Sequence, residues 1–486
     1  MGKVERNYLF TLANTISSML FPLITFPYAA RVMMADGIGQ VNFFSSIISY
    51  ISLFTCLGIP MYAVREIAKN RDDKQKLAQT ATEILLLHLC LTFIGYIAVI
   101  VIAFAVDKVA VDTPLFLLLS VSLLFGAVGC EWFYHGIEEF KYITLRAISV
   151  RVLFVILLFL LVHSREDIYL YALCSVIGTV GSNLYNFLRL RRHVDIHLVE
   201  FKNLNLRRHL DPAVKLFALN IVISIYVNLD TVMLGFMSTN AAVGYYTGST
   251  KMIRLLLGIA VSLQTATIPR FSYLIKAGKM EEFYGMVQRV VDFVISMSIP
   301  MSIILVMAAP SIITIFCGPS YMPAIVTLEI LAPVIIMISM SGIPCYQILY
   351  PLGKENIATM STATGALVNL ILNIVLIPIY QDKGAAIATL VAETIVTVTM
   401  FVYGRKYIKV KRYDAHYLNC ILGGLVMLAV LYLIRSLALE HWINIWLMPL
   451  TGAILYILVL YLRKDSFYEY AKERKNRYFG VCPQAG

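Results

Sequence analysis

The chain has 486 residues, of which 59% are hydrophobic and 14% are charged, and its mean hydropathy is +0.78. These values exclude an ordinary soluble globular protein and predict a chain that lies largely within a membrane. The formal net charge is +11, and in such a chain the excess belongs to loops beside anionic lipid headgroups, so it does not indicate nucleic-acid binding.

Long apolar stretches follow one another along the whole chain. Each is long enough to cross about 30 Å of hydrocarbon as a helix. We predict fourteen spans, at residues 8–31, 41–64, 81–106, 114–136, 143–163, 168–188, 213–237, 242–268, 290–316, 324–350, 357–380, 384–404, 416–437 and 442–462. The fold class is therefore an all-α polytopic membrane protein.

Lysine and arginine set the orientation of these spans. Most of the 40 lie at the two termini and in every second gap, with Arg146 and Arg151 counted in the gap after the fourth span. The exceptions are Arg31, Lys108, Arg165, Lys251, Arg254, Lys383 and Arg435. Cytoplasmic loops carry the excess of positive charge, so both termini are predicted to lie in the cytoplasm.

The first six spans are echoed by the next six at an offset of about 206 residues. Gly39 corresponds to Gly244, and Ile59-Pro60 corresponds to Ile268-Pro269. Parallel repeats of this kind are how many transporters are built. We therefore predict two pseudo-symmetric six-helix lobes and a C-terminal helix pair with a cytoplasmic tail, at residues 1–200, 201–408 and 409–486.

No motif of enzyme chemistry is present. The chain has no glycine-rich phosphate loop, no His-Glu-x-x-His and no nucleophile elbow. The eight cysteines stand singly without metal-ligand spacing, and we interpret them as buried thiols. No catalytic residue, resident metal or cofactor is expected, so transport would be driven by an ion gradient, by the substrate's own gradient or by a partner.

Three of the cations inside or at the edge of predicted spans form a candidate site. Lys251 lies about 13 Å into span 8, Arg254 follows one helical turn later, and Arg31 closes span 1. A charge at that depth is costly and marks a candidate functional site. Between the two halves these side chains would form a cationic wall suited to phosphate groups, although Arg31 would also be explained by reaching to the interface.

Intramembrane acids and amides form a second candidate set. Asp230 in span 7, Asn369 and Asn373 in span 11 and Thr389 in span 12 supply the oxygen ligands that a sodium ion accepts. Hydrogen bonds between helices explain the same polar residues equally simply. Glu131, Glu329 and Glu393 are further acidic candidates within spans.

Two passages carry a resemblance to a known family. The first runs from Pro22 to Arg31 and continues to Arg65-Glu66-Ile67-Ala68, and the second is Glu131-Trp-Phe-Tyr-His-Gly-Ile-Glu-Glu-Phe-Lys-Tyr-Ile-Thr-Leu-Arg146. They resemble the polysaccharide flippases, the O-antigen and capsule repeat-unit transporters of the multidrug, oligosaccharidyl-lipid and polysaccharide exporter superfamily. The resemblance covers essentially spans 1 to 12 and departs at Met33-Met34-Ala35-Asp36.

The resemblance implies a function in the bacterial cytoplasmic (inner) membrane. It implies a V-shaped, two-lobed bundle that moves undecaprenyl-diphosphate-linked oligosaccharide from the inner to the outer leaflet by alternating access. Spans 13 and 14 would hold the lipid tail, and relatives with sodium ligands on spans 7, 11 and 12 point to Asp230, Asn369, Asn373 and Thr389, with Na⁺ or H⁺ as the coupling ion. A polysaccharide polymerase and a chain-length regulator are the implied protein partners.

Three alternatives stay open at this point. A lipid II flippase would share the fold and the cationic cavity. A multidrug exporter of the same superfamily would need carboxylates facing a cationic drug, in place of Lys251 and Arg254. A membrane polysaccharide polymerase belongs to a different class and would need a sizeable loop for sugar chemistry, whereas the predicted outer gaps are short.

Overall fold

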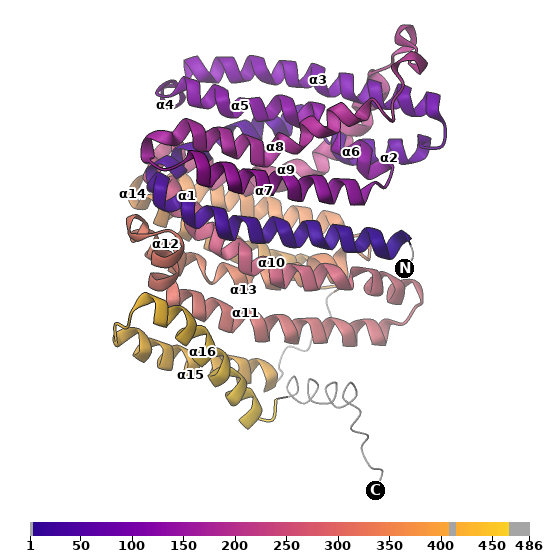
Figure 1. Cartoon of the computed structure of the whole chain (residues 1–486). Coiled ribbons are helices and arrows are strands. Elements are labelled where there is room, and N and C mark those ends of the chain that lie inside the picture. Colours follow the sequence, from indigo (N-terminus) through magenta and orange to yellow (C-terminus); the bar gives the residue numbers. More distant parts are fainter. Residues whose placement is uncertain (1–2, 408–414, 466–486) are drawn as a thin grey trace. The chain divides into compact units, whose positions relative to one another are not determined.

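The computed structural model describes residues 3–407 and 415–465, without the side chains of residues 3–5, 8, 218–220, 222–225, 259, 260, 262, 263, 265 and 266 (Figure 1). Every regular element in this part of the chain is helical. Ten of its helical segments are long and apolar enough to cross a membrane. The chain is therefore a multi-pass, all-α membrane protein, while the count of fourteen spans stays a prediction.

The chain divides into two compact units, residues 1–244 and 245–486. The unit boundary falls after α9 (Arg207–Met237), whereas the boundary predicted from the repeat falls before it. Helix α9 packs on the first unit at Gly58, where a Cβ atom would lie 2.6 Å from the Ala213 carbonyl oxygen. The two lobes inferred from the repeat, residues 1–200 and 201–408, thus remain a prediction, because the two compact units have a different boundary.

The first unit begins with a helix of 54 residues that holds two predicted spans. Helix α1 runs over Lys3–Cys56, and at 1.5 Å per residue it would be about 81 Å long if it were straight. It is interrupted at Met34, whose φ of 54° and ψ of −177° are not helical. The break lies inside Met33-Met34-Ala35-Asp36, the segment that differs from the turn usual in the family. This segment therefore still ends the first span.

The remaining helices of the first unit follow in chain order. They are α2 (Ile59–Asn70), α3 (Lys74–Ala105), α4 (Asp107–Ala110), α5 (Thr113–Val128), α6 (Glu131–Gly136), α7 (Phe140–Leu161) and α8 (Ile168–Leu190), followed by α9. The predicted fourth span is therefore two helices, α5 and α6, separated by Cys130 in a left-handed conformation with φ of 44°.

The second unit has a similar interruption. Its helices are α10 (Asn240–Lys276, which begins in the last residues of the first unit), α11 (Met280–Phe316), α12 (Ala324–Leu331), α13 (Val334–Gly342), α14 (Glu355–Gly404), α15 (Ala415–Ser436) and α16 (His441–Leu462). Helix α14 has 50 residues and breaks at Gln381, where φ is 53°. The predicted tenth span is built from α12, α13 and a π-helix at Ile343–Leu349, which shows how prolines interrupt a span without ending it.

Two glycines that the repeat pairs with each other also meet in space. A Cβ on Gly39 would lie 1.7 Å from the Asn240 carbonyl oxygen, and one on Gly244 would lie 2.0 Å from that of Ala35. Each glycine thus faces the residue four positions before the other. Helix α1 and the start of α10 cross here with backbone against backbone, which only glycine permits.

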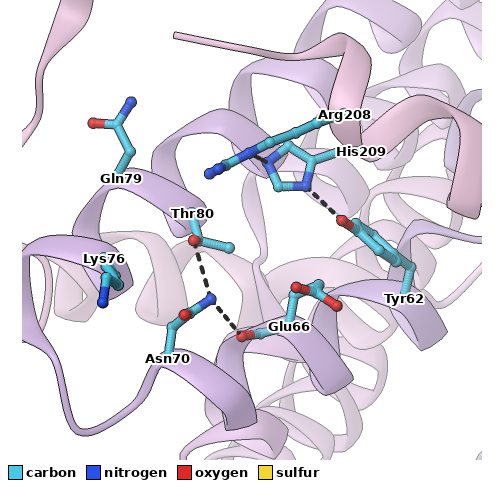
Figure 2. A pocket seen from close by; sticks show the side chains of 8 residues that line it. All are labelled: Tyr62, Glu66, Asn70, Lys76, Gln79, Thr80, Arg208 and His209. Carbon is cyan, nitrogen blue, oxygen red and sulfur yellow. Dashed lines mark hydrogen bonds between the residues drawn. The ribbon is translucent and has the colours of Figure 1, made fainter. Parts of the chain in front are cut away.

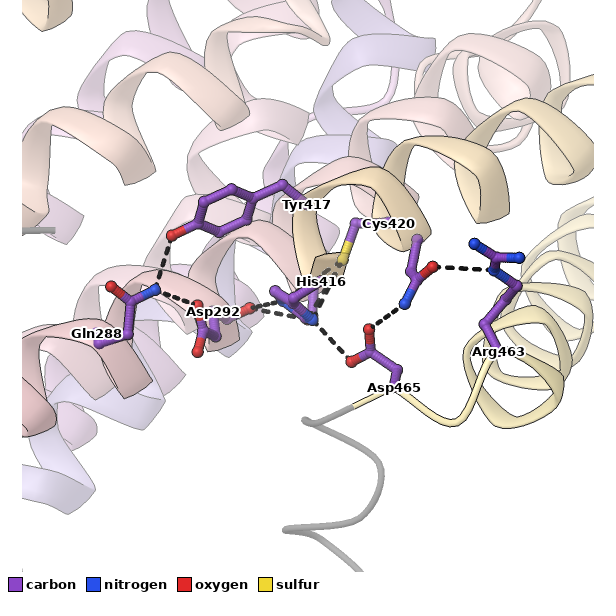
Figure 3. A network of polar contacts seen from close by, with 9 residues as sticks. Gln288, Asp292, His416, Tyr417, Cys420, Arg463 and Asp465 are labelled. Atoms are coloured by element: carbon purple, nitrogen blue, oxygen red, sulfur yellow. Dashed lines mark hydrogen bonds and ion pairs between the residues drawn. The ribbon is translucent and has the colours of Figure 1, made fainter. Parts of the chain in front are cut away.

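The C-terminal helix pair is attached to α11 by a buried polar network (Figure 3). Asp465 accepts from the Nδ2 of Asn419 at 2.8 Å and lies 2.7 Å from the Nδ1 of His416, with both members of the His416–Asp465 pair fully buried. The other ring nitrogen of His416 lies 3.1 Å from the Asp292 carbonyl oxygen on α11. A residue just beyond α16 therefore closes the contact between the helix pair and the rest of its unit.

We expect Asp465→Asn to lower the thermal stability of the protein. The substitution removes the charged acceptor of a buried network, at a cost of about 1–3 kcal/mol. The measurement is the melting midpoint of the purified protein in detergent. Lys464→Gln is the control, because Lys464 is adjacent and exposed. Equal midpoints for the two variants would contradict the stabilising role of the network.

Candidate functional site

Two arginines lie within a membrane span of the first unit, where the charge pattern does not predict them. The charge count assigns Arg146 and Arg151 to the preceding gap although the predicted span 143–163 contains them, and both lie inside α7, with Arg151 near its middle. The signal in the sequence is the apolar run that continues on both sides of Arg151. These are the functional candidates that sequence reasoning missed.

Arg151 connects α7 to α1. Its Nη1 donates to the side-chain oxygen of Asn14 at 2.9 Å, to the Asn14 carbonyl oxygen at 3.2 Å and to the hydroxyl of Ser17. Nearby, the hydroxyl of Thr144 donates to the Phe10 carbonyl oxygen at 2.9 Å. A guanidinium group in the middle of a span is thus held by neutral oxygens, so it keeps its positive charge uncompensated by these partners.

Arg146 pairs with the first residue of the aromatic motif. Its Nη2 lies 3.1 Å from Oε1 of Glu131, and the arginine side chain is 4% exposed while the glutamate is 49% exposed. Its Nε and Nη1 make no hydrogen bond to any described residue. The buried guanidinium of Arg146 therefore has two donor nitrogens that no described residue uses, and its carboxylate partner, Glu131, is half exposed.

The short helix α6 explains why the motif has its particular residues. Trp132, Phe133 and Tyr134 are all buried. Three successive residues of a helix can be buried together here because the chain turns at both ends of the short helix α6. A Cβ on Gly136 would lie 2.6 Å from a side-chain carbon of Ile67, so glycine lets α6 approach α2. The motif thus serves packing at its aromatic positions and charge at Glu131.

The acidic pair that follows the motif is engaged in ion pairs. Glu138 lies 3.0 Å from Arg71, and Glu139 lies 2.8 Å from Arg189. His193 is 3.7 Å from Glu139, and burial lowers the pKa of its imidazole. These contacts join the ends of helices, which agrees with the interpretation of Glu138 and Glu139 as helix-terminus residues instead of catalytic acids.

We expect Glu131→Gln to destabilise the protein by about 1–3 kcal/mol. Removing one member of a buried ion pair costs up to about 5 kcal/mol, and the exposure of Glu131 reduces that penalty. The melting midpoint in detergent measures it. Glu138→Gln is a matched control, because its partner Arg71 is 42% exposed and such pairs contribute under about 1 kcal/mol. The prediction is wrong if Glu138→Gln lowers the midpoint as much.

The predicted cations fall in both units. Arg31 has an exposed side chain on α1, just before the break at Met34. Lys251 is partly buried and Arg254 is exposed, one turn apart on α10. The predicted cationic wall between the halves stays a prediction, because these residues belong to different units.

The predicted oxygen ligands are likewise divided. Asp230 lies in α9 of the first unit and is 7% exposed. Asn369 and Asn373 are buried in α14, where the amide of Asn373 donates to Oδ1 of Asn369 at 3.0 Å. The hydroxyl of Thr389 lies 2.9 Å from that of Tyr246. Hydrogen bonds among protein groups thus occupy part of this set, and the sodium site stays a prediction.

Two further acids have distinct surroundings. Glu329 lies 2.8 Å from Arg435 of α15, so this pair joins the C-terminal helices to α12. Glu393 is 9% exposed in α14, and its carbonyl oxygen accepts from Thr397 at 2.8 Å. Glu329 therefore has a structural partner in Arg435, and Glu393 is a buried acid of α14.

Comparison with known proteins agrees with this organisation. A protein of Escherichia coli (strain K12) named as an O-antigen transporter is 25% identical over 408 residues, which are 83% of this chain and 97% of that protein. The solved structure of a lipid II flippase, MurJ, in an inward closed conformation covers 94% of this chain and 99% of its own, with a TM-score of 0.78 at 15% identity.

The solved structure of a multidrug resistance transporter of the MATE family, in an inward-facing conformation, covers 82% of this chain and 94% of its own, with a TM-score of 0.62 and 14% identity. These two likenesses show the fold. The E. coli relative is named a transporter, which confirms the expectation that this chain is a transporter and not an enzyme. The polysaccharide biosynthesis protein family matches residues 4–275, more than half of the sequence, and the chain therefore belongs to that family, as its motifs predict.

Proposed function

We propose that this protein is a flippase for lipid-linked oligosaccharides in surface polysaccharide synthesis. Its cargo is an undecaprenyl-diphosphate-linked repeat unit, which it moves from the inner to the outer leaflet of the bacterial cytoplasmic membrane. Family membership and the E. coli relative named as an O-antigen transporter support the proposal. The polymerase and chain-length regulator of the same polysaccharide are its proposed partners.

The observation that carries this proposal is the presence of guanidinium groups within a membrane span. Arg151 is held by neutral oxygens and the buried Arg146 has two donors without a described partner. Arginine matches phosphate oxygens with paired hydrogen bonds, and it would repel a cationic drug. A diphosphate is therefore a suitable cargo group for this chain, and a multidrug exporter's cargo is not.

In the proposed mechanism the diphosphate binds Arg31, Lys251 and Arg254, the guanidinium groups of Arg146 and Arg151 add positive charge in the first unit, and the apolar tail stays in lipid. The two lobes then open alternately to the two sides of the membrane. A cation, Na⁺ or H⁺, at Asp230, Asn369, Asn373 and Thr389 would shift the lobes toward one opening, provided that it binds the two states with different affinity. The proline-interrupted span made of α12, α13 and the π-helix is a candidate hinge.

Reconstitution into vesicles tests the proposal. Translocation of a lipid-diphosphate-linked oligosaccharide is measured by its accessibility to an added glycosidase, with no gradient, with a sodium gradient and with a proton gradient. We expect translocation that one gradient accelerates. Export of a cationic dye in place of the oligosaccharide would instead favour the multidrug exporter, and flipping of lipid II alone would narrow the cargo to the peptidoglycan precursor.

A further inference from the structure

A cavity of about 360 Å³ opens in the first unit where α2, α3 and the start of α9 meet (Figure 2). It lies at the end of the first unit that the charge pattern predicts to be cytoplasmic. Thr80 and Asn70 stand on one side of it, and Arg208 stands across from them. A polar recess of this size at a membrane surface is suited to a small charged group.

A satisfied network forms the floor of this cavity. Glu83 is 1% exposed, and its Oε2 lies 2.8 Å from Nε of Arg208 and 2.8 Å from Nε2 of His209. The other ring nitrogen of His209 lies 2.7 Å from the Tyr62 hydroxyl. Burial lowers the pKa of His209, which favours the neutral form of its ring. The network fixes Arg208 through Nε and leaves its two terminal amino groups for another partner.

The groups that face the cavity are mostly donors. The terminal amino groups of Arg208 make no hydrogen bond to a described residue. Thr80 accepts from the Asn70 amide at 3.3 Å and keeps its own proton to donate. Lys76 stands at the rim, and the one carboxylate in the wall, Glu66, is bound by Lys69 at 2.7 Å. Donors of this kind, with a guanidinium among them, bind a phosphate group.

The segment beside the cavity has the character of a membrane-surface element. Between α8 and α9 it forms two 3₁₀ turns, Ile196–Leu198 and Phe201–Asn203. The side chains of Ile196 and Phe201 are both 56% exposed, close to the basic residue Lys202. Apolar side chains exposed beside basic ones are stable at a lipid interface and costly in water.

This segment is attached to the same wall as the cavity. The amide oxygen of Gln79 on α3 accepts from the backbone N–H of Glu200 at 2.9 Å, and the amide of Gln75 donates to the Glu200 carboxylate at 3.1 Å. The exposed apolar turns and the donor-lined cavity are therefore parts of one surface. Lipid contacting the turns would bring headgroups to the cavity.

We propose that this cavity binds the phosphate of an anionic phospholipid while the two 3₁₀ turns enter the lipid interface. The phosphate bridges Arg208 of α9 and Thr80 of α3, and Lys76 adds attraction at the rim. Bound lipid thereby holds the segment that leads into α9 against α2 and α3. None of the residues that line the cavity is assigned to the proposed transport of the cargo, and the inference does not depend on that function.

Native mass spectrometry of the full chain tests this, after release from phosphatidylcholine vesicles made with and without phosphatidylglycerol. We expect the wild-type protein to retain phosphatidylglycerol selectively. Arg208→Gln and Lys76→Gln are each expected to lower that retention about tenfold. Lys74→Gln is the matched control, since Lys74 is exposed two residues from Lys76 and does not line the cavity.

Lys76→Gln keeps the test decisive if Arg208→Gln disturbs the buried network, because the ion pair of Lys76 is with Asp73, which lies outside that network. Equal retention in Lys76→Gln, Lys74→Gln and wild type would overturn the proposal. Equal retention of the two lipids would also overturn it. Phosphorus NMR with inorganic phosphate measures binding of the free anion. If Lys76→Gln weakens that binding and the wild-type protein retains no lipid selectively, the cavity binds a soluble ligand, and the lipid assignment is overturned.

Discussion

Lys251→Gln is expected to reduce translocation of the lipid-linked oligosaccharide at least tenfold while the protein still reaches the membrane. The substitution keeps most of the side-chain volume and removes the charge. A charge-assisted hydrogen bond to a phosphate contributes about 1.5–3 kcal/mol, which corresponds to a factor of about ten or more. The initial rate of glycosidase-accessible product in reconstituted vesicles is the measurement.

Lys276→Gln is the matched control for this loss. Lys276 is exposed in the last turn of the same helix, α10, so the variant makes the same charge change on the same element. Its rate should equal that of the wild type. A Lys251→Gln protein that is monodisperse and translocates normally would refute the role of Lys251 in holding the diphosphate.

Gly39→Ala is expected to destabilise the protein by about 3 kcal/mol or more. The new Cβ would lie 1.7 Å from a carbonyl oxygen and 2.6 Å from the carbonyl carbon of Asn240. Backbone atoms cannot turn aside as a side chain does, so two helices must separate. Thermal denaturation followed by size-exclusion chromatography measures the loss, together with the yield of monodisperse protein.

Gly126→Ala separates this clash from the general effect of replacing glycine. Gly126 lies within α5, and no neighbouring atom comes within 4 Å of the place that an alanine methyl group would take. Alanine there should stabilise the helix by up to about 1 kcal/mol. If both variants melt alike, the close crossing at Gly39 does not limit stability.

The fold was largely predictable because hydrocarbon imposes strict requirements on a chain. A span must be long, apolar and helical, so the sequence located the apolar segments well. Breaks within a span were harder to predict: Met34 and Gln381 fall in predicted gaps between spans, but Cys130, with φ of 44°, divides the predicted fourth span into two helices. Such breaks depend on how neighbouring helices pack, which a local pattern does not contain.

The candidate site was less predictable. Arg151 was missed because the charge count assigned it to the loop before its span, and its contacts with Asn14 and Ser17 show that it connects α7 to α1. The aromatic motif is a family signature whose purpose the sequence does not reveal. Its ion pair between Glu131 and Arg146 joins residues 15 positions apart, and such contacts follow from tertiary structure alone.

The buried pair of His416 and Asp465 also determines where the chain can be shortened. Asp465 comes three residues after the end of α16, so it looks like the beginning of a dispensable tail. A protein ending at Arg463 would keep every predicted span and yet leave His416 and Asn419 without their carboxylate. An affinity tag or fluorescent fusion should therefore be joined beyond Asp465, since a junction before it would weaken the attachment of the last two helices.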